Sequence, residues 1–88
     1  MPSLDQAVLS RAEFSCFAPN ATSVFLVGRF GQPKLGLRPM TRSDGGEWSA
    51  TLELPPGRYL YKFLVVYRGV LSVDEDRPAV VGRSERWN

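Results

Sequence analysis

The chain has 88 residues, of which 43% are hydrophobic and 23% are charged, and its formal net charge is +2. This length favours a single domain, and the composition is that of a folded protein, which excludes a disordered chain. The basic residues are spread along the sequence instead of gathering on one segment, so we expect no nucleic acid among its partners.

The first half of the chain shows short apolar segments separated by turn-forming residues, which is typical of an all-β sandwich or barrel. A first strand is expected at residues 12–17, followed by a Pro-Asn turn. A second is expected at 23–30. Because its residues 24–27 are apolar on both faces, it should be central and covered on both sides. Residues 31–39 contain two glycines and two prolines, which predicts a surface loop.

The middle of the chain holds the clearest strand signal. Residues 47–54 alternate strictly between apolar and polar side chains, which puts Trp48 and every second residue after it in the core. A short strand is expected to begin at Met40, and residues 43–46 should form the turn between the two strands.

A long aromatic strand is expected at residues 58–67, after a Pro-Pro-Gly corner at 55–57. Lys62 lies within an otherwise apolar row of this strand, so its stem should pack while its amine reaches water or a partner. Two brief strands with a charged, solvated loop between them complete the domain. They are expected at residues 70–73 and 79–81, with the loop at 74–78.

The residues needed for catalysis are missing. The chain has no histidine, which removes histidine bases, nucleophile pairs and metal ligands. Asp74, Glu75 and Asp76 are adjacent but lack the spacing of a cation-binding loop, and no nucleotide-binding or redox motif is present. Cys16 is the only cysteine, and its apolar neighbours predict a small buried hydrophobe instead of a reactive thiol. We expect no enzyme, no metal and no cofactor.

The hydropathy pattern gives no sign of membrane insertion. No apolar run approaches the length of about 18 residues needed to span a bilayer. The N-terminal residues lack the basic start and the long apolar stretch of a signal peptide. The expected location is therefore the cytoplasm, with no membrane partner.

Four segments carry a resemblance to a known family: FAPNATSVFLVGRF (17–30), PMTR (39–42), GEW (46–48) and LELPPGRYLYKF (52–63). With these landmarks, residues 12–78 resemble carbohydrate-binding module family 48. This family includes the N-terminal modules of isoamylases, branching enzymes and pullulanases, and the glycogen-binding domain of the AMP-activated protein kinase β-subunit. The resemblance implies an immunoglobulin-like antiparallel β-sandwich of the early-set type at residues 11–88, after an N-terminal segment at 1–10. It also implies non-catalytic binding of an α-glucan such as glycogen, starch or a maltooligosaccharide.

The family's sugar contacts are only partly present. In glucan-binding members a platform tryptophan follows the Val-x-Gly-x-Phe segment, and a second follows the Tyr-x-Lys-Phe strand; neither is found here. Lys62 matches the family lysine that bonds sugar hydroxyls, and Asn88 matches an asparagine near the family's last strand. Tyr67 and Trp87 are candidates for a relocated platform, although Trp87 is equally well placed to anchor the tail by packing.

Two functional interpretations therefore stand side by side. One is an α-glucan-binding module with a weakened site. The other is a protein-interaction or self-assembly domain on the same scaffold, since an unpaired sheet edge is a template for a homodimer or for another protein chain. An exposed aromatic ring beside Lys62 would favour the sugar, and its absence would favour the interaction role.

Overall fold

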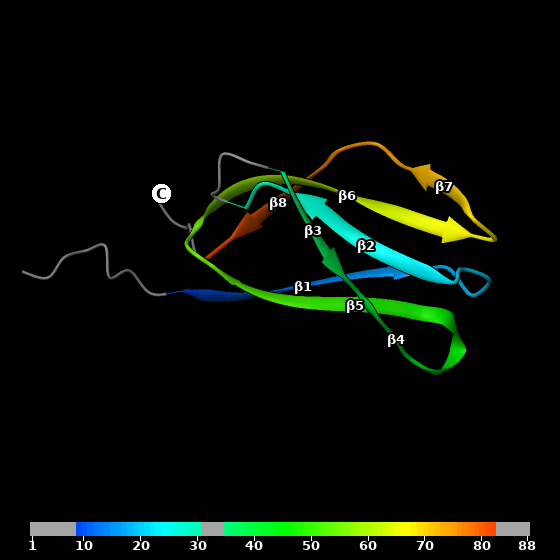
Figure 1. The fold of residues 1–88 in the computed structure, drawn as a ribbon. Helices are drawn as coiled ribbons and strands as arrows, with labels where there is room; N and C mark the ends of the chain where they lie inside the picture. The colour runs from blue at the N-terminus through cyan, green and yellow to red at the C-terminus, as the bar shows by residue number, and fades with distance from the viewer. Residues whose placement is uncertain (1–8, 31–34, 83–88) are drawn as a thin grey trace, which may run out of the picture.

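The computed structural model describes residues 9–30 and 35–82. Two antiparallel sheets face each other, which confirms the predicted β-sandwich (Figure 1). The smaller sheet has the strand order β1 (Ser10–Phe17), β5 (Glu47–Leu54), β4 (Thr41–Arg42). The larger sheet has the order β3 (Gly36–Pro39), β2 (Ser23–Gly28), β6 (Gly57–Tyr67), β7 (Val70–Val73), and β8 (Arg77–Val81) also pairs with β6.

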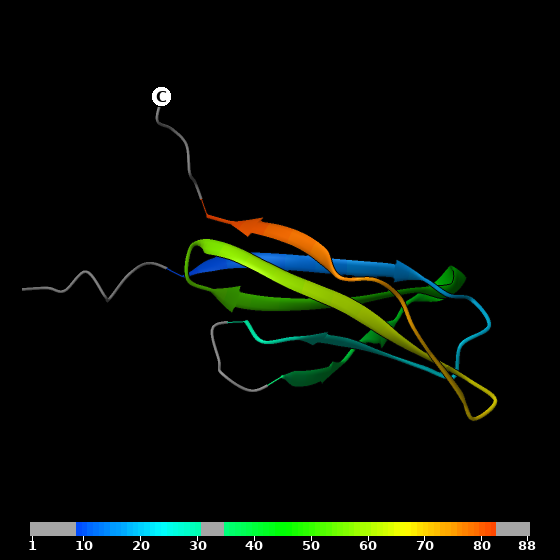
Figure 2. The same cartoon turned by 90° about the horizontal axis from the view of Figure 1, so that it is seen from above.

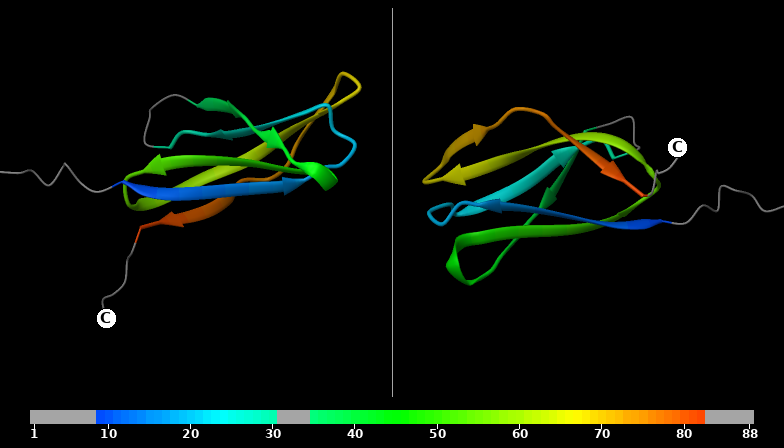
Figure 3. Two further views of the ribbon diagram at one scale, coloured as in Figure 1. Left: turned by 90° about the horizontal axis from the view of Figure 1, so that it is seen from below. Right: turned by 180° about the vertical axis from the view of Figure 1, so that it is seen from behind.

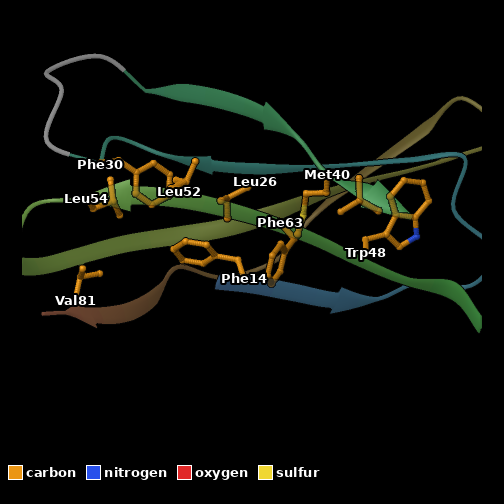
Figure 4. Close-up of a cluster of buried hydrophobic side chains, with 10 residues drawn as sticks. Phe14, Leu26, Phe30, Met40, Trp48, Leu52, Leu54, Phe63 and Val81 are labelled. Atoms are coloured by element: carbon orange, nitrogen blue, oxygen red, sulfur yellow. The ribbon is translucent and has the colours of Figure 1, made fainter. Parts of the chain in front are cut away.

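The core between the sheets comes from the alternation seen in the sequence. Trp48, Leu52 and Leu54 are buried on the inner side of β5, as predicted. They meet Val24 and Leu26 of β2, which are the most completely buried side chains among the described residues. Figure 4 shows this cluster between the two layers. The indole Nε1 of Trp48 donates a hydrogen bond to the Ala18 carbonyl at 2.9 Å, so its polar atom is satisfied.

The structure corrects the prediction of a loop at residues 31–39. Residues 36–39 form the edge strand β3, with Pro39 opposite Phe25 and Leu37 opposite Val27. Proline is tolerated there because an edge strand has no neighbour that needs its missing donor. The chain then crosses to the other sheet through Met40, which is buried and whose N–H donates to the Val24 carbonyl at 2.9 Å.

The expectation for the second strand also needs correction. β2 is central, between β3 and β6, but it ends at Gly28, and Phe30 beyond it has a positive φ of 41°. Its inner side chains are in the core. On the other side Val27 is buried but Phe25 only half-buried, and no second layer covers that side within residues 9–30 and 35–82. One apolar side of the larger sheet therefore faces solvent.

Residues 74–78 are not a simple solvated loop. Arg77 and Pro78 belong to β8. On β6, the ladder with β8 ends at Tyr61 and the ladder with β7 begins at Leu64, which leaves a gap between them. Asp74 closes this gap. The Asp74 carboxylate accepts a hydrogen bond from the Phe63 amide at 3.0 Å and another from Arg77 at 2.9 Å. The acid is part of the framework because it replaces a missing ladder partner.

Cys16 lies partly buried on β1 and packs against the core. Burial, followed by the nearby charge of Asp74, raises the pKa of its thiol above the usual value. A raised pKa leaves less of the reactive thiolate at neutral pH, in keeping with the predicted packing role.

Candidate functional site

The strands of the larger sheet display an apolar surface on the side away from the core, and we call this surface the outer face. Ladder pairs fix its membership, because directly opposed residues point to the same side. Figure 2 looks down on this side of the sandwich. The outer face consists of Phe25, Val27, Leu37, Leu60, Lys62, Leu64, Val66, Leu71 and Val73. Four apolar side chains of this face are more than half exposed, namely Leu37, Leu60, Leu71 and Val73. Adjacent exposed apolar residues make a surface a candidate interaction site.

Lys62 is the cation of this row. It pairs with Val27 of β2 on one side, and on the other side it lies in the gap between β7 and β8. Its side chain is 32% exposed, and Nζ lies 3.5 Å from Oδ1 of Asp76. The stem packs and the amine reaches a partner, as the sequence predicts, while the ammonium keeps donors for a ligand.

An open depression lies beside Lys62, where β2 ends and β6 begins. Its volume is about 550 Å³, which is in the range of small-molecule sites. Val27, Leu35 and Leu60 give it an apolar floor. Its charged lining residues are Arg29, Arg58, Lys62 and Asp76.

Phe25 is an aromatic residue of the outer face that the sequence reasoning did not single out. Phe25 pairs with Leu64, and this pair is the neighbour of the Val27–Lys62 pair on the same face of the sheet. The ring is half-buried. The signal was present in β2, because burying Val24 in the core turns Phe25 to the opposite side. No residue of the outer face is a fully exposed aromatic among the described positions.

Tyr67 is the one other predicted sugar contact within the described residues, and it does not lie beside Lys62. Tyr67 is 45% exposed and lies at the far end of β6, five residues after Lys62. Because five is an odd number of positions, its side chain points to the opposite side of the strand from Lys62. The guanidinium of Arg68 lies 5.4 Å from the centroid of its ring. Trp87 and Asn88 lie outside the described residues. Sequence reasoning also missed Arg29 and Arg58, which only the fold brings to Lys62.

The family described as carbohydrate-binding module 48 (isoamylase N-terminal domain) matches residues 3–77, most of the chain. The chain belongs to this family. The sandwich of the module agrees with that assignment. No curated protein matches the module in sequence.

Solved structures of glucan-degrading enzymes contain the same fold. The module is 25% identical to a pullulanase from Anoxybacillus sp. LM18-11 complexed with maltotetraose, with a TM-score of 0.66 over 73% of this chain and 10% of that chain. A type I pullulanase from Bacillus subtilis str. 168 complexed with maltose is 20% identical, with a TM-score of 0.72 over 90% of this chain and 12% of that chain. The module thus spans about a tenth of these proteins.

Within residues 9–30 and 35–82, no cluster of cysteine and acidic side chains is suited to hold a metal ion. The same residues include no helix with the length and apolarity to cross a membrane.

Proposed function

We propose that the module binds α-glucan chains on its outer face, around Lys62, and that it catalyses no reaction. The observation that carries the proposal is the placement of Lys62 beside an open depression with an apolar floor. Family membership supports it, as do the complexes of related pullulanases with maltotetraose and maltose.

A glucose unit has polar edges and apolar C–H faces, and the outer face offers a partner for each. The Lys62 ammonium can donate to hydroxyl groups while the exposed side chains of Leu35 and Leu60 contact a ring face. Stacking on an exposed aromatic ring, which contributes about 1–3 kcal/mol in base recognition, has no full equivalent on the described part of the outer face. We therefore expect weak binding with a dissociation constant of about 1 mM, equivalent to about −4 kcal/mol.

The test is a titration of the 88-residue protein with maltoheptaose, followed by amide chemical shifts. Shifts should concentrate on β2, β6 and Asp76. Lys62→Met keeps most of the apolar stem but removes the charged donor, and it should weaken binding about tenfold, because such a bond contributes about 1.5–3 kcal/mol.

Arg11→Met, on the opposite sheet, is the matched control and should leave the affinity unchanged. No response at millimolar sugar would contradict the proposal. Shifts confined to β1 and β5 would do so as well.

A second candidate function is self-assembly, and the edge of β1 favours it. β1 pairs with β5 along all eight residues, while no described strand pairs with its other edge. β8 lies beside that edge (Figure 3), but no backbone ladder joins the two strands. A groove of about 330 Å³ separates them, lined in part by Phe14, Tyr61 and Ala79. An open edge of this length is a template for strand addition.

The charges of β1 favour a second copy as its occupant. Arg11 and Glu13 both lie on the solvent side of the strand, with opposite charges. Within one copy, Nε of Arg11 lies 3.6 Å from Oε2 of Glu13. Antiparallel pairing of two β1 strands about Ala12 would place each Arg11 opposite Glu13 of the second copy. A two-fold interface is self-complementary in this way.

This assembly is tested by sedimentation velocity between about 10 µM and 1 mM, a range that brackets weak association. We expect a dimer that Glu13→Arg weakens by placing like charges across the strands. The double exchange Arg11→Glu with Glu13→Arg should restore the dimer, because opposite charges then face each other again across the two strands. A monomer over the whole range would rule out this function.

A further inference from the structure

Three cations converge on the depression of the outer face. Arg58 and Lys62 lie two residues to either side of Leu60 on the outward side of β6. Gly28, the last residue of β2, is paired with Tyr61 of β6. The next residue along the chain, Arg29, therefore comes beside Leu60, the residue that precedes Tyr61, and both line the depression. The arginines come from segments 29 positions apart, which only the β2–β6 pairing brings together.

The depression carries an excess of positive charge. Among the described residues of its lining, Asp76 is the only acid, and it pairs with Lys62. Among the described residues, ion pairs engage Arg11, Lys62 and Arg77, but neither Arg29 nor Arg58. Along a strand, Arg58 and Lys62 are each only about 7 Å from Leu60, so an anion beside Leu60 would lie within reach of both cations. Such an anion would meet a focused positive potential.

The apolar lining of the depression limits which class of anionic ligand suits it. Leu60 is 59% exposed and Leu35 57% exposed, and Val27 lies beneath them. A free inorganic anion would leave this apolar surface unused. A ligand that combines apolar faces with a localised negative charge matches both features.

We propose that the depression binds α-glucan that carries phosphate monoesters, in preference to neutral α-glucan; this rests on the proposed function above. A glucose unit packs on the exposed side chains of Leu60 and Leu35. The phosphate of the same or a neighbouring unit accepts hydrogen bonds from Arg29 and Arg58, whose planar guanidinium groups suit its oxygens. Lys62 stays available for a hydroxyl group because Asp76 already balances its charge.

The experiment is a titration of the 88-residue protein, followed by amide shifts, with four ligands. These are phosphorylated maltooligosaccharides prepared from phosphate-rich starch, the same preparation after phosphatase treatment, maltoheptaose, and inorganic phosphate. We expect the phosphorylated sugar to bind at least tenfold tighter than the dephosphorylated one at low salt. This ratio should fall as salt is added, since salt screens exposed charges.

Arg58→Gln and Arg29→Gln should each reduce the ratio several-fold. Arg38→Gln and Arg68→Gln, which remove a charge outside the depression, should leave it unchanged. Matching urea midpoints for all four variants would show that the fold is intact.

The outcomes separate this inference from the proposed function. Equal affinity for phosphorylated and dephosphorylated sugar would overturn the inference while leaving α-glucan binding in place. Inorganic phosphate binding as tightly as the phosphorylated sugar would reveal an adventitious ion only and would also overturn it. No binding of any sugar would overturn both.

Discussion

Leu26→Ala is expected to lower the free energy of unfolding by about 3–5 kcal/mol, the range for a fully buried leucine whose removal leaves a cavity. Leu26 has no exposed surface and lies on β2, the central strand of the larger sheet. A chain of 88 residues has a total stability of about 4–13 kcal/mol. The substitution would therefore remove a large share of it.

Urea denaturation followed by tryptophan fluorescence measures this effect. Leu37→Ala is the matched control, since Leu37 lies on the neighbouring strand of the same sheet but is 57% exposed. The control should change the free energy by no more than about 0.5 kcal/mol. A loss below 1 kcal/mol for Leu26→Ala would show that the sandwich core does not pack as described.

Gly46→Ala is expected to cost about 2–4 kcal/mol, the sum of a strained backbone and a steric clash. Gly46 has a φ of 88°, and a Cβ there would lie 2.5 Å from the Pro19 Cα. Its carbonyl also accepts the Ala18 amide at 2.9 Å, so moving the turn disturbs the end of β1. Both sources of cost act at the same position.

The neighbouring glycine separates the two sources. Gly45 has the same φ of 88° but nothing within 4 Å of a Cβ position. Gly45→Ala should therefore lose only the backbone contribution, about 1–2 kcal/mol. Urea denaturation of both variants gives the comparison, and equal losses would contradict the close contact between Gly46 and Pro19.

The outer face explains how the module can keep a binding role without the tryptophan platforms of its family. Phe25 offers a half-buried ring one pair along from Lys62, and Leu60 offers an exposed aliphatic surface. Neither equals an exposed indole, so affinity would have to come from charge or from several sites acting together. The cations around Leu60 are the residues of the described chain that favour the first route.

The sequence by itself determined the class of fold, because alternation and turn residues are local signals. The strict pattern of residues 47–54 predicted β5 residue for residue and placed Trp48 in the core. The apolar row around Lys62 in residues 58–67 likewise predicted that the stem of Lys62 would pack and its amine would reach a partner.

The tertiary structure alone decided which residues accompany Lys62. Glycine and proline made residues 36–39 read as loop, yet an edge strand accepts both because one of its sides needs no partner. Asp74 read as a solvated acid, but it fills a gap between two strands that local sequence does not show. Arg29 and Arg58 meet at Leu60 only through the β2–β6 register, and such long-range pairing leaves no periodic signal in the chain.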